Sequence, residues 1–322
     1  MRLAIVGATG NVGREFIKII EQRSLKYDTL SLFASKRSAG SVLDVNGKPH
    51  TVEPLTEKSA QGIDIALFSA GGETSLEFAP IFAKAGALVI DNSSAWRMDI
   101  GVPLVVPEVN PHHIPTHKGI IANPNCSTIQ AVVTLAPLHQ AFGLKRVVFS
   151  TYQAVSGAGQ VAIKDLENGH SGIPPEAFKH PIAGNVIPQI DHFTDNGYTK
   201  EEMKMIDETR KIMGLPDLRV TATAVRVPVV TGHSISINVE LERPFTIRAV
   251  RELMANSPGI ILQDDPDLSL YPMPLPSAGT DSVFVGRVRR DESLSNGLNL
   301  WCVADNLRKG AALNAIQIAE LV

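Results

Sequence analysis

In the first 125 residues, short apolar runs alternate with segments whose apolar positions recur at helical spacing. The apolar runs lie at 2–6, 29–35, 63–70, 87–93, 104–108 and 119–124. Helical patterns separate several of them, as at 11–24 and 75–86. Near-continuous apolar strands that alternate with helices indicate a parallel sheet covered on both faces. The pattern therefore predicts an α/β fold that begins with a Rossmann-like, doubly wound domain.

From about residue 145 the pattern changes to longer segments, several of which alternate apolar and polar residues. These segments lie at 146–157, 218–230, 234–242, 282–290 and 298–305. Alternation with a period of two is typical of an antiparallel sheet with one covered face. A Pro-, Gly- and His-rich loop at 168–191 is long enough to indicate a functional or interaction role.

The two patterns divide the chain into two domains. Residues 1–125 are predicted to form a dinucleotide-binding domain. Residues 126–305 are predicted to form a catalytic and dimerisation domain of the α+β class, built on a mostly antiparallel sheet. The chain ends in an apolar helical pattern at 306–322, which we expect to pack back on the first domain.

Composition excludes several classes of protein. The 322 residues carry a net charge of −3, without a basic block, so a nucleic-acid partner is not expected. Two cysteines cannot build a disulfide framework, and no Cys-x-x-Cys pair indicates a metal site. The N-terminal apolar run is too short for a signal peptide, and no stretch reaches the ~18 apolar residues of a membrane span. We therefore expect a cytoplasmic protein without a membrane or metal partner.

A glycine-rich turn follows the first predicted strand directly. Gly7, Gly10 and Gly13 form a G-x-x-G-x-x-G pattern between that strand and the next helix. Such a turn lets a ligand approach the backbone, and the helix N-terminus favours a phosphate. The spacing differs from the usual G-x-G-x-x-G, but the strand–turn–helix context indicates a dinucleotide site. A purely structural turn is the alternative.

The end of the second predicted strand bears on the choice of cofactor. NAD-binding proteins usually place an acid there, to bind the ribose hydroxyls. This chain instead has Lys36, Arg37 and Ser38. Positive charge with a hydroxyl suits a 2′-phosphate, so together with the glycine turn these residues predict NADP. A solvated basic turn is the alternative.

Cys126 follows the predicted strand at 119–122, on the sheet edge where the glycine turn also lies. A helical pattern begins there, and Pro137 is expected to kink or break it. A helix N-terminus favours the thiolate form of cysteine, and Asn125 offers an amide to a developing oxyanion. A packed, inert cysteine is the alternative, and Cys302, flanked by apolar residues, fits that description.

A nucleophilic cysteine beside a nicotinamide suggests one chemistry. The thiolate adds to an aldehyde, hydride leaves to NADP, and an acceptor such as phosphate takes the resulting thioester. A base must also handle protons. His233 follows Gly232 at a break between two predicted strands, where its side chain can face a cleft. Arg226 lies among apolar residues on the preceding strand, and a buried arginine needs an anion.

Eight motifs together resemble the aspartate-β-semialdehyde dehydrogenase family. They occur in the family's order from end to end: GATGNVG, SSAWRMD, VPLVVPEVNP, NPNCSTIQ, STYQAVSGAG, YTKEEMKM, VRVPVVTGHS and DNLRKGAALNA. The resemblance implies reversible reductive dephosphorylation of β-aspartyl phosphate to L-aspartate 4-semialdehyde with NADPH. This step leads to lysine, by the diaminopimelate pathway, and to threonine and methionine. It also implies a homodimer formed through the second domain's sheet, or a dimer of dimers.

The resemblance also assigns roles to individual residues. Cys126 corresponds to the nucleophile, His233 to the acid/base, and Gln153 to the residue that orients the thioester and substrate. The assigned ligand contacts are Arg226 for the substrate carboxylate, Glu201 for its amino group, and Arg97 with Lys204 for phosphate. The assigned cofactor contacts are Gly7, Thr9, Gly10, Asn11, Val12, Arg37, Ser38, Ser156, Gly157 and Asn306. The chain has Ala224 where the family often has cysteine, and Gln189 where histidine is expected.

The YTKEEMKM segment also has a physical interpretation of its own. Thr199 and Glu202 fit a capping box, which makes Glu202 structural. Glu201 and Lys204 share one helix face, where such a pair is usually a surface ion pair. The resemblance is what favours a functional role for them.

Other functions remain possible at this point. N-acetyl-γ-glutamyl-phosphate reductase also uses a nucleophilic cysteine and a histidine. Its substrate is acetylated and has no free amino group, so an acid that binds an amino group, such as Glu201, would have no function there. A glyceraldehyde-phosphate-type dehydrogenase has a different motif around its cysteine. A catalytically inactive dinucleotide-binding regulator would have no need to keep Cys126, Gln153, Arg226 and His233 together.

Overall fold

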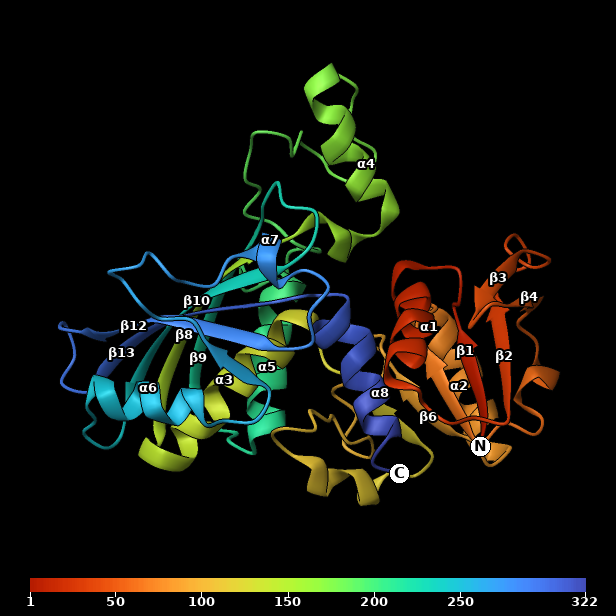
Figure 1. The fold of residues 1–322 in the computed structure, drawn as a ribbon, viewed down its shortest axis with the longest axis horizontal. Coiled ribbons are helices and arrows are strands. Elements are labelled where there is room, and N and C mark those ends of the chain that lie inside the picture. Colours follow the sequence, from red (N-terminus) through yellow and green to blue (C-terminus); the bar gives the residue numbers. More distant parts are fainter. The chain divides into compact units, whose positions relative to one another are not determined.

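The computed structural model describes residues 1–322 (Figure 1). It divides into two compact units, one formed by Met1–Asn125 with Ala311–Val322 and the other by Cys126–Gly310. Residues 306–310, which the sequence pattern groups with the final helix, lie in the second unit. None of the helices combines the length and the apolar character that crossing a membrane requires.

The first unit is built on a seven-stranded sheet in the order β3-β4-β2-β1-β5-β6-β7. Its strands are β1 (Arg2–Val6), β2 (Thr29–Ala34), β3 (Val42–Val45), β4 (Lys48–Pro54), β5 (Ile65–Phe68), β6 (Leu88–Asp91) and β7 (Ile120–Ala122). All neighbouring strands are parallel except β3 and β4. The predicted doubly wound parallel sheet is therefore confirmed.

Two details of the first sheet differ from the prediction. The pattern does not predict the β3–β4 hairpin, whose residues are largely exposed and which turns at Asn46 and Gly47 with positive φ. The predicted strand at 104–108 is wrong, because only Leu104 makes an isolated bridge, to Ala122. Pro107 has no N–H to donate to a sheet, so this apolar run packs beside the sheet edge instead.

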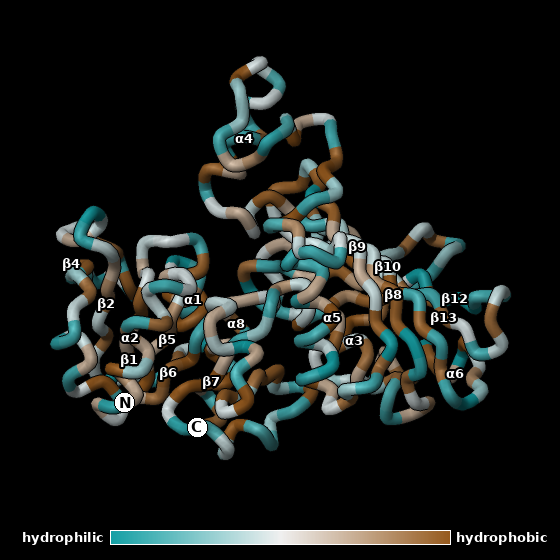
Figure 2. Tube along the Cα trace, turned by 180° about the vertical axis from the view of Figure 1, so that it is seen from behind, coloured by the Kyte–Doolittle hydropathy of each residue, from teal (hydrophilic) through white to brown (hydrophobic).

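Helices cover both faces of this sheet. Helix α1 (Asn11–Arg23) contacts α8 (Leu313–Ala319), and both enclose a core that includes Leu3, Ile5 and Leu67. Successive strand residues point to opposite faces. Phe68 accordingly faces the other way and packs edge-on, with ring centroids 5.1 Å apart, against Phe82 of α2 (Gly72–Lys84). Figure 2 shows the hydrophobic segments running along the strands.

The second unit contains a six-stranded sheet in the order β11-β12-β13-β10-β8-β9. Its strands are β8 (Leu144–Gln153), β9 (Arg219–Arg226), β10 (His233–Leu241), β11 (Ile260–Leu262), β12 (Val283–Asp291) and β13 (Gly297–Ala304). The β12-β13-β10-β8 pairs are antiparallel, and the two outer pairs are parallel. The mostly antiparallel sheet is thus confirmed.

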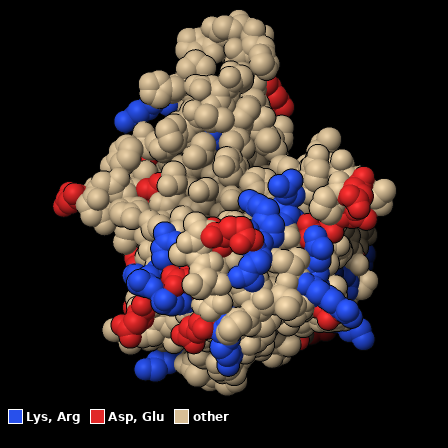
Figure 3. All heavy atoms as spheres, turned by 90° about the vertical axis from the view of Figure 1, so that its left-hand side faces the viewer, with Lys and Arg blue, Asp and Glu red and all other residues tan.

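One face of this sheet is covered by α3 (Cys126–Phe142), α5 (Lys200–Met213) and α6 (Ile247–Ala255). On β8, Val147 and Phe149 are buried, whereas Val148 is half-buried and Tyr152 is exposed. The alternation therefore leaves the other face open, as the period of two predicts. On the side of the molecule in Figure 3, basic and acidic side chains are interspersed rather than segregated.

Helix α3 runs through Pro137 to Phe142, so of the two outcomes expected at this proline, a kink or a break, the break does not occur. A proline inside a helix removes one hydrogen bond. Nearly every residue from Ser127 to Leu138 is buried, and this packing holds the helix together across the missing bond.

The 168–191 segment is ordered around a small core of its own. It follows α4 (Gln160–Asn168), and Val155, Ala162, Ile182 and Ile187 form a separate hydrophobic cluster. The Asp165 carboxylate accepts backbone N–H groups from residues 176–178. Ile187 then exchanges two backbone hydrogen bonds, of 2.9 and 2.8 Å, with Arg226 at the end of β9.

Candidate active site

The glycine turn between β1 and α1 uses its three glycines differently. A Cβ on Gly7, whose φ is +87°, would lie 2.3 Å from the Ser69 carbonyl oxygen. A Cβ on Gly13 would lie 2.2 Å from the Gly7 carbonyl oxygen. Gly10, which caps α1, has no such conflict, since its nearest neighbour would be 3.5 Å away. The fold requires Gly7 and Gly13, whereas the absent side chain of Gly10 keeps the helix N-terminus accessible to a ligand.

A cavity of about 400 Å³ lies beside this turn at the carboxyl ends of the parallel strands. Its lining includes Gly7, Thr9, Gly10, Arg37 and Ser38. Asn11 and Val12 occupy the first turn of α1 and do not line it. The carboxyl edge of a parallel sheet is where such folds bind nucleotides.

The turn after β2 supplies positive charge to this cavity. Ser38 N–H donates to the Ser35 carbonyl at 2.9 Å and closes the turn. Arg37 is exposed and lines the cavity, whereas Lys36 is exposed and does not line it. The strand end carries no acid, so the site suits a phosphate better than a pair of ribose hydroxyls. The residues present therefore fit a dinucleotide that carries an additional phosphate on its ribose.

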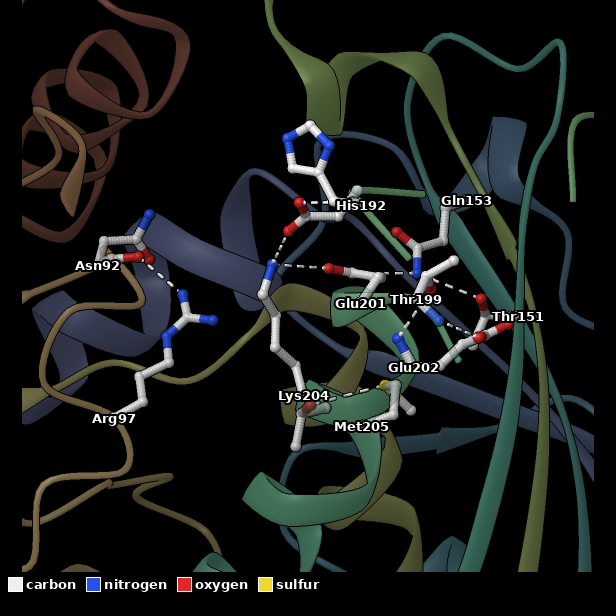
Figure 4. Close-up of polar contacts among 12 residues, drawn as sticks. Asn92, Arg97, Thr151, Gln153, His192, Thr199, Glu201, Glu202, Lys204 and Met205 are labelled. Atoms are coloured by element: carbon white, nitrogen blue, oxygen red, sulfur yellow. Dashed lines mark hydrogen bonds and ion pairs between the residues drawn. The ribbon is translucent and has the colours of Figure 1, made fainter. Parts of the chain in front are cut away.

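Arg97 follows β6 in the same unit and is 7% exposed. Its Nε donates to the Asn123 carbonyl at 2.9 Å, and its Nη2 donates to the Asn92 carbonyl at 2.8 Å (Figure 4). Asn123 is itself held by Asn92 and by Asn314 of α8. These contacts fix the orientation of the guanidinium. Asn125, the last residue before α3, is buried.

The two cysteines lie in different surroundings within the second unit. Cys126 is the first residue of α3 and is partly exposed. Gly310 packs against it, since a Cβ there would lie 2.9 Å from the Cys126 Cβ. Cys302 is fully buried on β13, and burial raises the pKa of its thiol to about 12. Only Cys126 combines access with a helix N-terminus, which stabilises a thiolate.

His233 begins β10 and is fully buried. Its Nδ1 accepts the backbone N–H of Ala154 at 3.0 Å, and its backbone carbonyl accepts Gln130 Nε2 at 3.1 Å. Burial, and secondly the positive charge of Arg226, lower the pKa of His233 well below its usual range. The imidazole is therefore neutral at physiological pH.

Arg226 ends β9 and is 5% exposed. Its Nη1 donates to the Ala154 carbonyl at 2.7 Å, while its Nε is buried without a hydrogen-bond partner. Burial lowers the pKa of Arg226, and the negative charges of Glu201 and Cys126 act in the opposite direction. The guanidinium thus lies in electrostatic reach of a carboxylate and of the candidate nucleophile.

A polar network at the start of α5 connects Gln153, Glu201 and Lys204 (Figure 4). Gln153 Nε2 donates to Glu201 Oε1 at 3.2 Å, and Lys204 Nζ reaches Glu201 Oε2 at 3.2 Å and Asp191 Oδ2 at 2.9 Å. Burial lowers the pKa of Lys204, but Glu201 and Asp191 outweigh it, so the net shift is upward. Glu201 is 5% exposed, so the pair is not an ordinary surface ion pair.

The capping box predicted at α5 is confirmed. Glu202 N–H donates to the Thr199 hydroxyl at 3.3 Å, and Thr199 N–H donates to Glu202 Oε2 at 2.7 Å. The other carboxylate oxygen of Glu202 accepts the Ala224 N–H at 2.9 Å. Glu202 thereby ties the helix to β9 and fixes the first turns of the helix, which carry Glu201 and Lys204.

Three residues predicted to contact the cofactor lie in this unit. Asn306 accepts the Gly232 N–H at 2.9 Å and donates to the Ser156 hydroxyl at 3.0 Å. A Cβ on Gly157 would lie 3.2 Å from Arg226 Nη1 and 3.3 Å from His233 Nε2. Asn306 and Ser156 therefore hold the backbone just before His233, and Gly157 packs so closely on His233 and Arg226 that a side chain at position 157 would be crowded.

The sequence patterns did not indicate three further residues around these groups. They are Ala154, whose backbone binds both His233 and Arg226, Asp191, which pairs with Lys204, and Gly310, which packs on Cys126. Each acts through its backbone, through its lack of a side chain, or from the end of a long loop. No residue type at these positions carries a recognisable signal.

Known proteins resemble the chain along its whole length. A family model described as "Semialdehyde dehydrogenase, NAD binding domain" matches residues 2–117, and "Semialdehyde dehydrogenase, dimerisation domain" matches residues 135–309. The aspartate-semialdehyde dehydrogenase of Aquifex aeolicus is 57% identical over 331 residues, which cover 100% of this chain and 97% of the relative.

Solved structures agree with these matches. The structure of aspartate semialdehyde dehydrogenase II from Vibrio cholerae complexed with ASA is similar at a TM-score of 0.96, with 48% identity, and covers 99% of this chain and 97% of that one. The enzyme of Candida albicans with NADP is similar at a TM-score of 0.78, with 26% identity, over 99% and 97% of the two chains.

Proposed function

Because this chain belongs to the aspartate-semialdehyde dehydrogenase family, we propose that it catalyses the NADP-dependent, reversible reductive dephosphorylation of β-aspartyl phosphate to L-aspartate 4-semialdehyde. The reaction passes through a thioester on Cys126 and serves lysine, threonine and methionine biosynthesis. A reducing compartment keeps such a thiol from being oxidised, which favours the cytoplasm. When bound, the nicotinamide supplies or accepts the hydride.

The observation that carries this proposal is the pairing of opposite charges beside the candidate nucleophile. Arg226 and Glu201 are both nearly buried, and the charges of Glu201 and Cys126 both act on Arg226. A free amino acid presents a carboxylate and an ammonium group. Arg226 binds the carboxylate through a forked pair of hydrogen bonds, and Glu201 binds the ammonium.

The remaining roles in this proposal are those that the family resemblance assigns, and local contacts support them. Gln153, held by Thr151 and Glu201, orients the acyl group on Cys126. Asn125 donates to the carbonyl oxygen, where charge develops as the thiolate adds, and His233 acts as the acid/base. Arg97, whose guanidinium is fixed by two backbone carbonyls, and Lys204 bind the phosphate that attacks or leaves. Lys204 is charged at neutral pH because its pKa is raised.

The proposed cofactor is NADP. Gly7, Thr9 and Gly10 present the helix N-terminus of α1 to its phosphates, and Arg37 and Ser38 bind the 2′-phosphate. Asn11 and Val12 contribute from the first turn of α1, and Ser156, Gly157 and Asn306 contribute from the second unit. The structure of the Candida albicans relative with NADP supports this choice.

We also propose that the open face of the second sheet forms a homodimer, as the description of the matched dimerisation domain suggests. Tyr152 and Trp301 pack together there, with ring centroids 5.4 Å apart, beside a cavity of about 430 Å³. Sedimentation analysis of Trp301→Glu should show a shift toward the monomer. Unchanged mass for this variant would place the interface elsewhere.

A comparison of two substrates tests the enzymatic proposal. NADPH formation is measured with L-aspartate 4-semialdehyde and phosphate, and in parallel with N-acetyl-L-glutamate 5-semialdehyde and phosphate. The free amino acid should react at least about a hundredfold faster, since the acetylated nitrogen carries no positive charge for Glu201 to bind. Equal or faster turnover of the acetylated substrate contradicts the proposal, and absence of turnover with both indicates an inactive dinucleotide-binding protein.

A further inference from the structure

Two buried asparagines connect the C-terminal helix to Arg97. Asn314 lies on α8, Asn123 directly follows β7, and both residues are completely buried. Asn314 Nδ2 donates to Asn123 Oδ1 at 2.7 Å and to the Val105 carbonyl at 3.0 Å. A carbonyl oxygen can only accept hydrogen bonds, so the nitrogen of the Asn314 amide must face Val105 and Asn123. The orientation of this amide is therefore fixed.

Asn123 is held through its side chain and holds Arg97 through its backbone. Its Oδ1 accepts from Asn314, and its Nδ2 donates to Asn92 Oδ1 at 2.7 Å and to the Ala311 carbonyl at 3.1 Å. Its backbone carbonyl accepts Arg97 Nε at 2.9 Å. If the amide were reversed, its oxygen would face the Asn92 oxygen, and its nitrogen would face the Asn314 nitrogen. The C-terminal segment therefore determines which way the Asn123 side chain points.

Arg97, Asn92 and Asn123 form a closed ring of hydrogen bonds within the first unit. Arg97 Nη2 donates to the Asn92 carbonyl at 2.8 Å (Figure 4), and Arg97 Nε donates to the Asn123 carbonyl. The side chains of Asn92 and Asn123 complete the ring with their own hydrogen bond. The two carbonyls that hold the guanidinium thus belong to residues that are bonded to each other. The distance between these carbonyls depends on the position of the Asn123 amide.

Loss of the Asn314 amide would disturb this ring from its buried side. Asn123 Oδ1 would lose the donor that it has there, and a buried acceptor without a donor is costly. A shift of the Asn123 side chain that recovers a partner also shifts the carbonyl that binds Arg97 Nε. Because Arg97 is itself nearly buried, little water is present to replace that hydrogen bond.

We propose that Asn314 is a positioning residue for the phosphate-binding arginine. It fixes the Asn123 amide, and Asn123 together with Asn92 fixes the guanidinium of Arg97. This inference rests on the proposed function for the ligand of Arg97, which is inorganic phosphate. It gives the C-terminal helix a part in the reaction, although none of its side chains is proposed to touch the substrate.

Hydrogen exchange at the arginine side chain tests the positioning directly. In ¹⁵N-arginine-labelled protein without ligands, the Arg97 Nε–H signal is assigned by its loss in Arg97→Lys. Exchange of this proton with solvent should be at least about tenfold faster in Asn314→Leu than in the wild type, because the ring opens more often. Asn314→Asp, which keeps the size of the side chain but replaces its N–H donors, is a second variant with the same expected change. Unchanged exchange in the folded variants overturns the inference.

Bisubstrate kinetics tests the consequence for phosphate. Asn314→Leu should raise KM for phosphate by at least about threefold and leave kcat and KM for the semialdehyde near their wild-type values, because only phosphate binding is weakened. Gln317→Leu is the matched control and should leave all three constants unchanged. Gln317 is an amide one turn further along α8, and its Nε2 donates to Glu108 Oε1 at 3.2 Å.

The double variant Arg97→Lys with Asn314→Leu tests the route of the effect. If Asn314 acts through Arg97, the double variant has the same KM for phosphate as Arg97→Lys alone. A KM that combines both single effects, or a loss shared by phosphate and semialdehyde, shows general support of the fold and overturns the inference. An unchanged KM in Asn314→Leu beside a raised KM in Arg97→Lys also overturns it. An unchanged KM in Arg97→Lys contradicts the proposed phosphate role of Arg97 instead, and the exchange measurement, which needs no turnover, then decides the inference.

Discussion

The glycine turn of the first unit and the charged cluster of the second are built in opposite ways. At the turn, the proposed recognition of the cofactor depends on backbone groups and missing side chains, with the exposed Arg37 adding charge. In the cluster, Arg226 and Glu201 are buried and Lys204 is partly buried, and Glu201 interacts with both cations. A ligand that binds at the turn must displace water from exposed groups. A ligand that binds in the cluster contacts charged groups that lost most of their water when the protein folded.

This difference determines how each region responds to substitution. A change at the exposed turn should weaken one contact and leave the rest of the protein unaffected. A change in the cluster leaves the partner of the altered residue buried without compensation, which costs several kcal/mol when one member of a buried ion pair is removed. Effects in the cluster should therefore be larger and should extend to more than one kinetic constant.

The largest expected effect is the loss of the nucleophile. Cys126→Ala should lower kcat by at least about a thousandfold, because the thioester cannot form. Cys302→Ala is the matched control and should leave kcat nearly unchanged, since its thiol is buried and protonated. Steady-state assays with circular dichroism on both variants give the comparison.

Thiol labelling provides an independent measurement of the same contrast. Alkylation followed by mass spectrometry should modify Cys126 first, and substrate should protect it. A Cys126→Ala enzyme that keeps a tenth of the wild-type rate shows that covalent catalysis at this residue is wrong.

The next effect separates the two arginines. Arg226→Lys should raise KM for the semialdehyde and lower kcat/KM by about 10- to 100-fold. Lysine cannot form the two parallel hydrogen bonds that the guanidinium makes to a carboxylate, and buried polar groups would be left without partners. Arg97→Lys should raise KM for phosphate by about tenfold and change KM for the semialdehyde little. Arsenate, which mimics phosphate, should share the Arg97→Lys defect.

Bisubstrate kinetics in the phosphorylating direction distinguishes these outcomes. If Arg97→Lys leaves the phosphate dependence unchanged, or if Arg226→Lys alters KM for phosphate alone, the assignment of the two anions is reversed or wrong. Movement of both constants in both variants shows that the two anion sites overlap.

The sequence predicted the glycine turn better than the surroundings of the charged cluster, and the reason is physical. The turn consists of adjacent residues, so strand, glycines and helix appear in order in the chain. Within the cluster, only Glu201, Glu202 and Lys204 are close in sequence, and helical spacing predicted both the shared face and the capping box. Asp191 and Ala154 come from other segments, and no local pattern contains that information.

The errors in the predicted fold have the same origin. The β3–β4 hairpin is largely exposed and lacks apolar periodicity, so its sequence does not indicate strands. The hairpin forms because β4 pairs with β2 at the edge of the sheet. Helix α3 continues past Pro137 because tertiary packing outweighs the local preference. The roles of the individual site residues were suggested by the family resemblance and stay predictions.

At the glycine turn, Arg37→Ala should weaken NADP binding by about one to two decades, which corresponds to about 1.5–3 kcal/mol for a charge-assisted contact. Binding of NAD should stay almost unchanged, because NAD lacks the 2′-phosphate. Lys36→Ala is the matched control, since Lys36 has the same charge but does not line the cavity. Fluorescence titration with both cofactors measures the effect. Equal losses for NADP and NAD show that Arg37 supports the loop and does not bind the phosphate.

The smallest effect concerns the two carboxylates that hold Lys204. Burial alone lowers the pKa of Lys204, and Glu201 and Asp191 raise it above its usual value. Asp191→Asn removes one of the two raising charges, so the pKa of Lys204 must fall and the neutral amine must appear at a lower pH. KM for phosphate should therefore rise a few-fold at pH 9 and stay near the wild-type value at pH 7, because there the lysine remains charged.

Lys204→Met, which has no charge at any pH, is the control and should raise KM for phosphate at both pH values. A change in Asp191→Asn that is the same at pH 7 and pH 9 contradicts an effect through the charge of Lys204. It would indicate that Asp191, whose backbone has a positive φ at the end of the 168–191 loop, acts by holding that loop against β9.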